Sequence, residues 1–121
     1  MKKTLISFFL FSICFCINAD NIEVVLNPAG NQHDHFEHYP IADMPDAVYY
    51  DNVTHEIVIE ADGTSLYYNV QIVSNQLQQT VISTQVSGYG DTIDVSSLSS
   101  GLYTIVITSQ FYNMYEGYVV I

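Results

Sequence analysis

Apolar and polar residues alternate along most of the chain after about residue 20, and this alternation constrains the fold more than any other feature. A period of two places successive side chains on opposite faces of a β-strand. No segment carries a helical period over a length sufficient for a helix. The alternating runs are 22–26, 47–50, 57–61, 66–72, 82–86, 93–95, 103–107 and 118–121, separated by Gly, Asn, Asp and Ser. The sequence therefore predicts an antiparallel β-sandwich of seven to eight strands.

Residues 1–19 have the three parts of a secretory signal peptide. Two lysines supply positive charge, the apolar run 5–17 follows, and Ala19 is the small residue before the expected cut. The apolar run is too short for a transmembrane helix, which needs about 20 residues. We therefore expect an exported protein, either periplasmic or outside the cell (secreted or at the cell surface), in which residues 20–121 form one β-sandwich domain.

The charge of the mature chain argues against several classes of function. The sequence has 13 Asp and Glu but only 2 Lys and Arg, and both of these are lysines of the expected signal peptide. Without Lys or Arg, a protein lacks the groups that bind nucleic-acid phosphates or anionic lipid. We expect no nucleic-acid partner and no membrane insertion after cleavage. Cys14 and Cys16 also lie in the signal peptide, so we expect no disulfide.

The stretch LSSGLYTIVI, residues 98–107, is the most specific structural signal. A tight turn containing glycine precedes a tyrosine that starts an alternating strand, as in the tyrosine corner of Greek-key sandwiches. We expect the Tyr103 hydroxyl to hydrogen-bond to the backbone near Leu98. The alternative is a tyrosine that is only half-buried.

The layout of these segments resembles a family of small secreted domains from Bacteroidetes, the domain of unknown function 3244. The resemblance covers about residues 39–121 and rests on YPIADMPDAVYYDNVTHEIVIE, YYNVQIVS, IDVSSLSSGLYTIVI and YEGYVVI. It implies an immunoglobulin-like fold and brings no agreed function. The expected fold class is therefore all-β, an immunoglobulin-like antiparallel β-sandwich of seven to eight strands.

The second half of the chain also resembles the C-terminal sorting domain of the type IX secretion system. The shared feature is a turn of the form hydrophobic-Ser-Ser-Leu-x-x-Gly-x-Tyr. Those domains usually end in a basic strand, whereas YEGYVVI has no basic residue. This second resemblance is therefore weaker than the first.

Three of the four histidines lie in NQHDHFEHYP, within the long irregular connection that we expect over 28–44. Neutral imidazole is a ligand for zinc, copper or nickel. Structural zinc sites usually join ligands from separate segments and include cysteine, which this stretch does not. The alternative is a polar loop whose histidines titrate with pH, and we expect no cofactor. The candidate metal ligands are His33, His35 and His38, with Asp34 or Glu37 to complete the shell and His55 as a distant addition.

Carboxylates and hydroxyls offer two weaker kinds of site. Asp43, Asp46 and Asp51 cluster near the start of one strand, but no stretch has the spacing of a calcium loop. Asp also shapes turns without a metal. Ser, His and Asp are all present, but the Gly-x-Ser-x-Gly elbow of a hydrolase is not. We expect no enzymatic activity, because so small a sandwich has no obvious insertion to form a cleft.

The chain has ten tyrosines and no tryptophan. Two pairs of adjacent tyrosines, 49–50 and 67–68, lie on expected strands, so one member of each pair must point outward. Outward tyrosines beside acidic residues can form a recognition surface for protein or glycan, although tyrosine also simply favours strands. The candidate recognition surface is Tyr50, Tyr67 and Tyr115.

The sequence thus favours an exported, non-catalytic binding or interaction module whose protein or glycan ligand is unknown. One alternative is a structural partner that assembles by strand addition, as pilin-like proteins do. It rests on the expectation that the chain ends inside its final strand at Ile121 and so offers an open edge. The other alternative is weak transition-metal binding through the loop that holds His33, His35 and His38.

Overall fold

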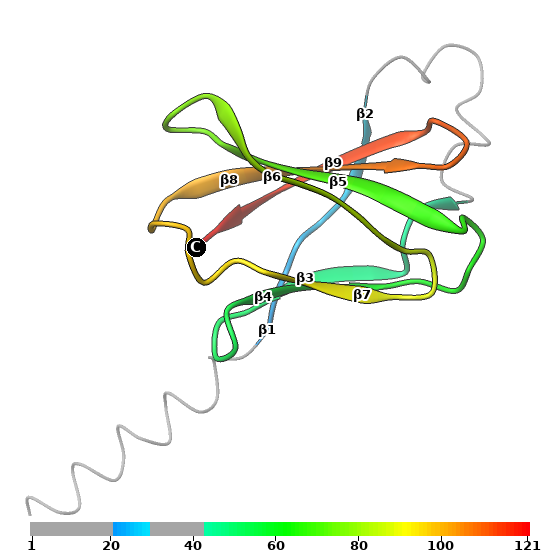
Figure 1. The fold of residues 1–121 in the computed structure, drawn as a ribbon, viewed down its shortest axis with the longest axis horizontal. Helices are drawn as coiled ribbons and strands as arrows, with labels where there is room; N and C mark the ends of the chain where they lie inside the picture. The colour runs from blue at the N-terminus through cyan, green and yellow to red at the C-terminus, as the bar shows by residue number, and fades with distance from the viewer. Residues whose placement is uncertain (1–20, 30–42) are drawn as a thin grey trace, which may run out of the picture.

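Nine strands in the described residues form two antiparallel sheets that pack face to face (Figure 1). The structure is a computed structural model, and it describes residues 21–29 and 43–121. One sheet has the order β1-β3-β4-β7, and the other has the order β2-β9-β8-β5-β6. The strands are β1 (Asn21–Glu23), β2 (Asn27–Ala29), β3 (Ala47–Asp51), β4 (Glu56–Glu60), β5 (Tyr67–Ser74), β6 (Gln79–Ser87), β7 (Asp91–Asp94), β8 (Leu102–Ser109) and β9 (Met114–Val120).

The core lies between the two sheets and is built from alternate residues of each strand. β8 shows the pattern most clearly, because Tyr103, Ile105 and Ile107 are buried while their neighbours are exposed or half-buried. Full burial of such a side chain stabilises the fold by about 1.5–3 kcal/mol. The predicted all-β class is confirmed. None of the described segments forms a helix of the length and hydropathy needed to cross a bilayer.

The strand count is nine rather than seven to eight because the run 22–26 changes sheet. β1 pairs with β3, and β2 pairs with β9 in the opposite sheet. Between them the buried Val24 donates its N–H to the carbonyl of Val48 at 2.8 Å. The crossing chain passes so close to β9 that a Cβ at Gly117 would lie 2.6 Å from the Val25 carbonyl oxygen. Alternation alone does not show this change of sheet, since the apolar period continues through it.

Two predictions about the ends of segments are wrong. The irregular connection expected over 28–44 begins later, because Pro28 and Ala29 pair with β9. The final strand begins at Met114 and lies between β2 and β8. β2 pairs with Met114, Tyr115 and Glu116, so the first part of β9 is not an open edge for strand addition.

A hydrogen bond from Tyr103 closes the turn before β8 as a tyrosine corner. The buried Tyr103 donates its hydroxyl to the carbonyl of Ser99 at 2.6 Å. The acceptor is one residue after Leu98, which instead packs against the core. This contact ties the chain that crosses from one sheet to the other back onto the start of β8.

Candidate functional site

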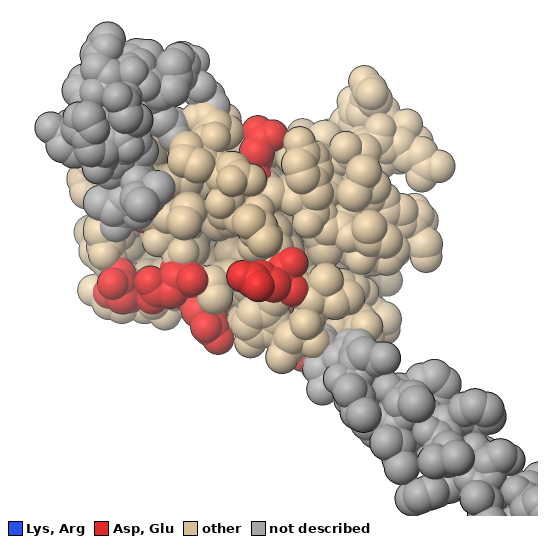
Figure 2. All heavy atoms as spheres, turned by 180° about the vertical axis from the view of Figure 1, so that it is seen from behind, with Lys and Arg blue, Asp and Glu red and all other residues tan. Residues whose placement is uncertain are grey.

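The outer faces of the two sheets differ sharply in charge. In Figure 2 the acidic residues gather over the four-stranded sheet, while the surface of the five-stranded sheet contains few of them. The cross-strand register gives the same division, because five carboxylate residues face outward from the four-stranded sheet. Among the outward positions of the five-stranded sheet, Glu116 alone carries a carboxylate. The five acidic residues of the other sheet are Glu23, Asp51, Glu56, Glu60 and Asp94.

On the acidic face, like charges lie directly opposite one another. Glu56 pairs with Asp51 on one side and with Asp94 on the other. Such pairs destabilise a sheet, and the described residues contain no Lys or Arg to relieve them. Nearby, the Tyr49 hydroxyl donates to Oε2 of Glu60 at 3.5 Å. Desolvation, followed by the charge of Glu60, raises the pKa of Tyr49.

Several of these carboxylates have a local role in turns. Oδ1 of Asp51 accepts the backbone N–H groups of Val53 and Thr54, and Oδ1 of Asp94 accepts that of Ser96. These backbone hydrogen bonds lower the pKa of both Asp51 and Asp94. Among the residues that the structure describes, no three His, Cys, Asp or Glu side chains are placed to hold a metal ion. The acidic face is therefore explained in part by turn chemistry.

His55 is the one histidine within the described residues. It ends the turn between β3 and β4 with a φ of 61°, and its Nδ1 lies 3.2 Å from the Tyr50 hydroxyl. The predicted ligands His33, His35 and His38 lie outside the described residues, so metal binding by that loop stays a prediction. Within the described part of the chain, His55 contacts a tyrosine and does not belong to a group of side chains that could hold a metal ion.

The outer face of the five-stranded sheet is neutral and carries exposed apolar side chains at one end. Leu102 pairs with Val120, and the neighbouring pair is Thr104 with Tyr118. Leu102, Tyr118 and Val120 are 43%, 57% and 65% exposed. The remaining outward positions are mostly uncharged amide, hydroxyl and aliphatic residues, namely Asn69, Gln71, Gln85, Ser83, Thr80, Thr108, Val73, Val106, Met114, Asn27 and Ala29.

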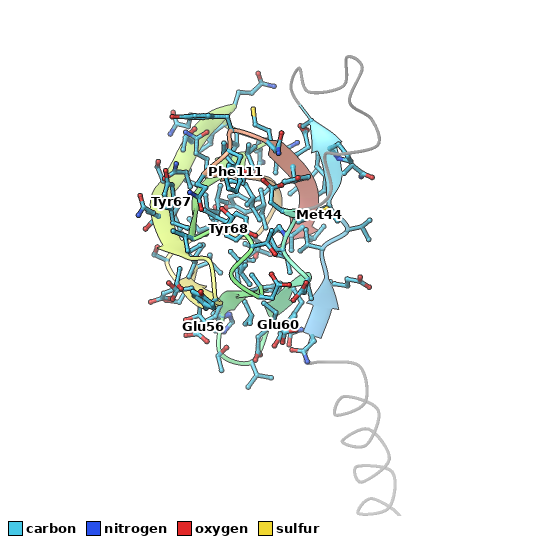
Figure 3. The ribbon with its side chains drawn as sticks, turned by 90° about the vertical axis from the view of Figure 1, so that its right-hand side faces the viewer. Met44, Glu56, Glu60, Tyr67, Tyr68 and Phe111 are labelled. Atoms are coloured by element: carbon cyan, nitrogen blue, oxygen red, sulfur yellow. The ribbon has the colours of Figure 1, made fainter. Side chains whose placement is uncertain are left out.

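The four edge strands of the sandwich differ in how well they are protected from pairing with another chain. β1 and β2 have three residues each, and β2 contains Pro28, while the four-residue β7 begins and ends with aspartate. Short length, proline and charge all discourage the pairing of an edge with another chain. β6 has nine residues, QTVISTQVS, without charge or proline. It forms the yellow-green edge at the left of Figure 3, and among the described strands it pairs only with β5. β6 is therefore the least protected edge.

A buried acidic residue, Asp43, joins three elements in a way that the sequence did not indicate. Its side chain accepts hydrogen bonds from Ser109 Oγ at 2.6 Å, Asn113 Nδ2 at 3.1 Å and the Tyr115 hydroxyl. Its backbone carbonyl accepts the Tyr68 hydroxyl at 2.8 Å. Asp43 is only 3% exposed. This network fixes the chain before β3 against the ends of β5, β8 and β9.

The predicted tyrosine surface is wrong at two of its three positions. Tyr50 points into the core, where its hydroxyl meets His55, and Tyr115 points inward to Asp43. Tyr67 is half-buried on the outside of β5, whereas its neighbour Tyr68 points into the sandwich (Figure 3). The outward tyrosine on β9 is Tyr118. The sequence does not show clearly which face of β9 is inward, because the inward position between Tyr115 and Val119 is Gly117, which has no side chain.

The buried tyrosines predict loss of stability at high pH. Burial, followed by the Asp43 charge, raises the pKa of Tyr68 to about 12, and burial with the Asp43 hydrogen bond raises the pKa of Tyr115 further. In the unfolded chain, tyrosine titrates near pH 10. A raised pKa in the folded state contributes stability that is complete below pH 10 and is lost as pH rises toward 12.

We therefore expect chemical denaturation to give a falling free energy of unfolding between about pH 10 and pH 12. Tyr68→Phe should have a shallower slope over this range than the unmodified protein, because it removes one of the protons whose release is linked to unfolding. Tyr118→Phe is the control, since Tyr118 is exposed. Equal slopes for all three proteins would contradict the prediction.

Comparisons with known proteins bear on the fold. No protein-family profile matches the chain, and no curated protein matches its sequence significantly. A solved structure from Bacteroides vulgatus is similar, with a TM-score of 0.61 at 15% identity. The alignment covers 84% of this chain and 98% of that chain, which is described as a DUF3244 family protein with an immunoglobulin-like β-sandwich fold.

This chain is an immunoglobulin-like β-sandwich. Its structural match is to a domain family of unknown function from Bacteroides, in agreement with the predicted resemblance. At 15% identity the match concerns the fold of the sandwich, so function has to be argued from the surfaces described above. The likeness to type IX sorting domains stays a prediction.

Proposed function

We propose that this sandwich is an exported, non-catalytic interaction module, and that it binds an extended segment of a partner protein as an added strand along β6. The observation that carries the proposal is the length and neutrality of this edge. In strand addition, backbone hydrogen bonds supply affinity, and alternate side chains supply specificity. This proposal moves the predicted strand-addition site from β9 to β6.

The hydrogen bonds at the end of β6 indicate which backbone groups face the open side. The N–H of Gly88 donates to Leu66 of the chain before β5, whereas the N–H of Ser87 donates away from β5 to Oδ2 of Asp91. Backbone direction alternates along an antiparallel strand. The N–H and C=O groups of Gln85 and Ser83 therefore face the open edge, where an added strand would pair with them.

The side chains of β6 fit an added strand of ordinary composition. Thr84 and Val86 lie on the core side of the strand, and Ser83 and Gln85 lie on the outer side. A partner segment with alternating apolar and polar residues would extend both faces of the five-stranded sheet. Such a segment needs no charged group of its own, because β6 presents none.

A labelled peptide provides the test. The probe is the β5 sequence YYNVQIVS with two lysines added at each end, because β5 already pairs with β6 and has the matching alternation. Fluorescence anisotropy should show binding to the purified protein. Gln85→Pro removes an outward N–H while leaving the inward ladder, and should weaken binding by about tenfold or more through the lost hydrogen bond and added bulk. Gln85→Ala keeps the N–H and should bind as the unmodified protein does.

A second probe separates strand pairing from general attraction between lysines and an acidic protein. It is the same peptide with alternate backbone amides N-methylated, which keeps its charge but blocks the ladder, and it should not bind. Equal binding of both peptides, or equal binding by Gln85→Pro and Gln85→Ala, would overturn the proposal. Circular dichroism of each variant checks that the sandwich remains folded.

A further inference from the structure

We infer that the neutral outer face of the five-stranded sheet docks face to face on the same sheet of a second copy of this chain. The inference is independent of β6 strand addition, because it uses the face of the sheet rather than its edge. It starts from the exposed apolar cluster formed by Leu102, Tyr118 and Val120 at one end of β8 and β9. Contiguous apolar side chains on a water-facing sheet mark an interaction surface.

The charge distribution selects a second copy as the occupant. Each copy carries its carboxylate rows on the opposite, four-stranded sheet, so docking through the neutral sheets places the two acidic faces on the far sides of the dimer. Four stacked sheets about 10 Å apart separate those faces by about 30 Å. The Debye length is about 8 Å at physiological ionic strength. Repulsion between the acidic faces would therefore be small in this arrangement.

Other arrangements of two copies would bring carboxylates of both copies close together. Docking through the four-stranded sheets would bring Asp51, Glu56 and Asp94 of both copies together without any Lys or Arg in the described residues. Pairing of two β6 edges would bring the neighbouring β7 edges together, with Asp91 and Asp94 on each. The neutral face is thus the large surface on which two copies approach with the least repulsion.

The composition and extent of the face predict a weak dimer. Five strands at about 4.8 Å spacing and about seven residues of length give roughly 600 Å² on each copy. The resulting total of about 1,200 Å² is at the lower limit for specific complexes. Glu116, one strand from the β2 edge and opposite Val106, is the one carboxylate that this face would bring to the contact, which also favours a weak dimer. We expect a dissociation constant in the micromolar range.

Sedimentation equilibrium of the purified protein tests the inference. The expected result is a monomer–dimer equilibrium that changes little between low and high salt. Val120→Glu and Val120→Lys should each weaken the dimer about tenfold or more, because both replace an apolar contact with a charge. Val53 provides the matched control, since it is 64% exposed against 65% for Val120 and lies in the β3–β4 turn. Val53→Glu and Val53→Lys should leave dimerisation unchanged.

Three results would overturn the inference. The first is a monomer at every concentration up to the millimolar range. The second is equal weakening by the Val53 and Val120 variants, which would indicate a general effect of charge. The third is a dimer that Gln85→Pro abolishes and Val120→Glu leaves intact, which would place the contact at the β6 edge.

Discussion

Asp43→Ala is expected to lower the free energy of unfolding by about 3–5 kcal/mol, because two buried hydroxyls and an amide lose an acceptor at once. The donors are Ser109, Asn113 and Tyr115. Ser109 Oγ also accepts the backbone N–H groups of Phe111 and Asn113, so the loss would extend into the β8–β9 turn. The same substitution would loosen the chain before β3 from the sandwich.

Urea denaturation followed by circular dichroism would measure this effect. Asp46→Ala is the matched control, because Asp46 is exposed three residues away, and it should change stability by less than about 0.5 kcal/mol. Asp43→Asn keeps the size of the side chain but replaces one acceptor oxygen with a donor, so it should also be destabilising. If Asp43→Ala were as stable as Asp46→Ala, the network would not hold the fold as described.

Gly88→Ala is expected to destabilise the protein by about 3 kcal/mol or more, as overpacking against a fixed backbone does. A Cβ at Gly88 would lie 1.6 Å from the carbonyl oxygen of Ser65. That backbone cannot retreat easily, because the buried Ser65 hydroxyl bonds to the Tyr67 carbonyl and accepts the N–H of Gln110. Gly88 itself donates its N–H to the Leu66 carbonyl at 2.9 Å.

Gly90→Ala offers a graded comparison in the same turn. Gly90 has a φ of +119°, which an alanine adopts only with strain, but its closest contact for an added Cβ is 3.3 Å. We expect this variant to lose about 1–2 kcal/mol, less than Gly88→Ala. Thermal unfolding of both variants would rank them. The opposite ranking would show that backbone conformation, rather than close approach to Ser65, makes glycine necessary in this turn.

The sequence predicted the class of fold well because alternation reports burial directly. Ile105 and Ile107 are inward, and Tyr103 forms its corner through Ser99. The same rule could not say which member of the pair 49–50 faces inward, because both positions hold tyrosine. The answer came from pairing with β4, where Tyr50 lies opposite the buried Ile57.

The sequence did not predict the Asp43 network, because the donors to its carboxylate are 66 to 72 residues away along the chain. No local pattern joins an aspartate in one connection to a serine at the end of a distant strand. One signal was present, however. Ser109 continues the inward alternation of Tyr103, Ile105 and Ile107, and a serine at an inward position needs a hydrogen-bond partner.

The division of charge between the sheets was also not readable from the sequence. Alternation indicates that Glu56 and Glu60 point outward, but it does not say which strands share a sheet. That assignment depends on the crossing between β1 and β2 and on the pairing of β4 with β7. The neutral face and the acidic face can be recognised only when it is known which strands belong to each sheet.

This uneven charge gives the described part of the sandwich an electric dipole directed across its two sheets. Such a molecule does not tumble freely near a charged boundary, because a fixed field turns a dipole before any contact is made. Close to a negatively charged surface, the acidic sheet would face away and the neutral sheet would face the boundary. The orientation would weaken as salt is added, since screening shortens the range of the field.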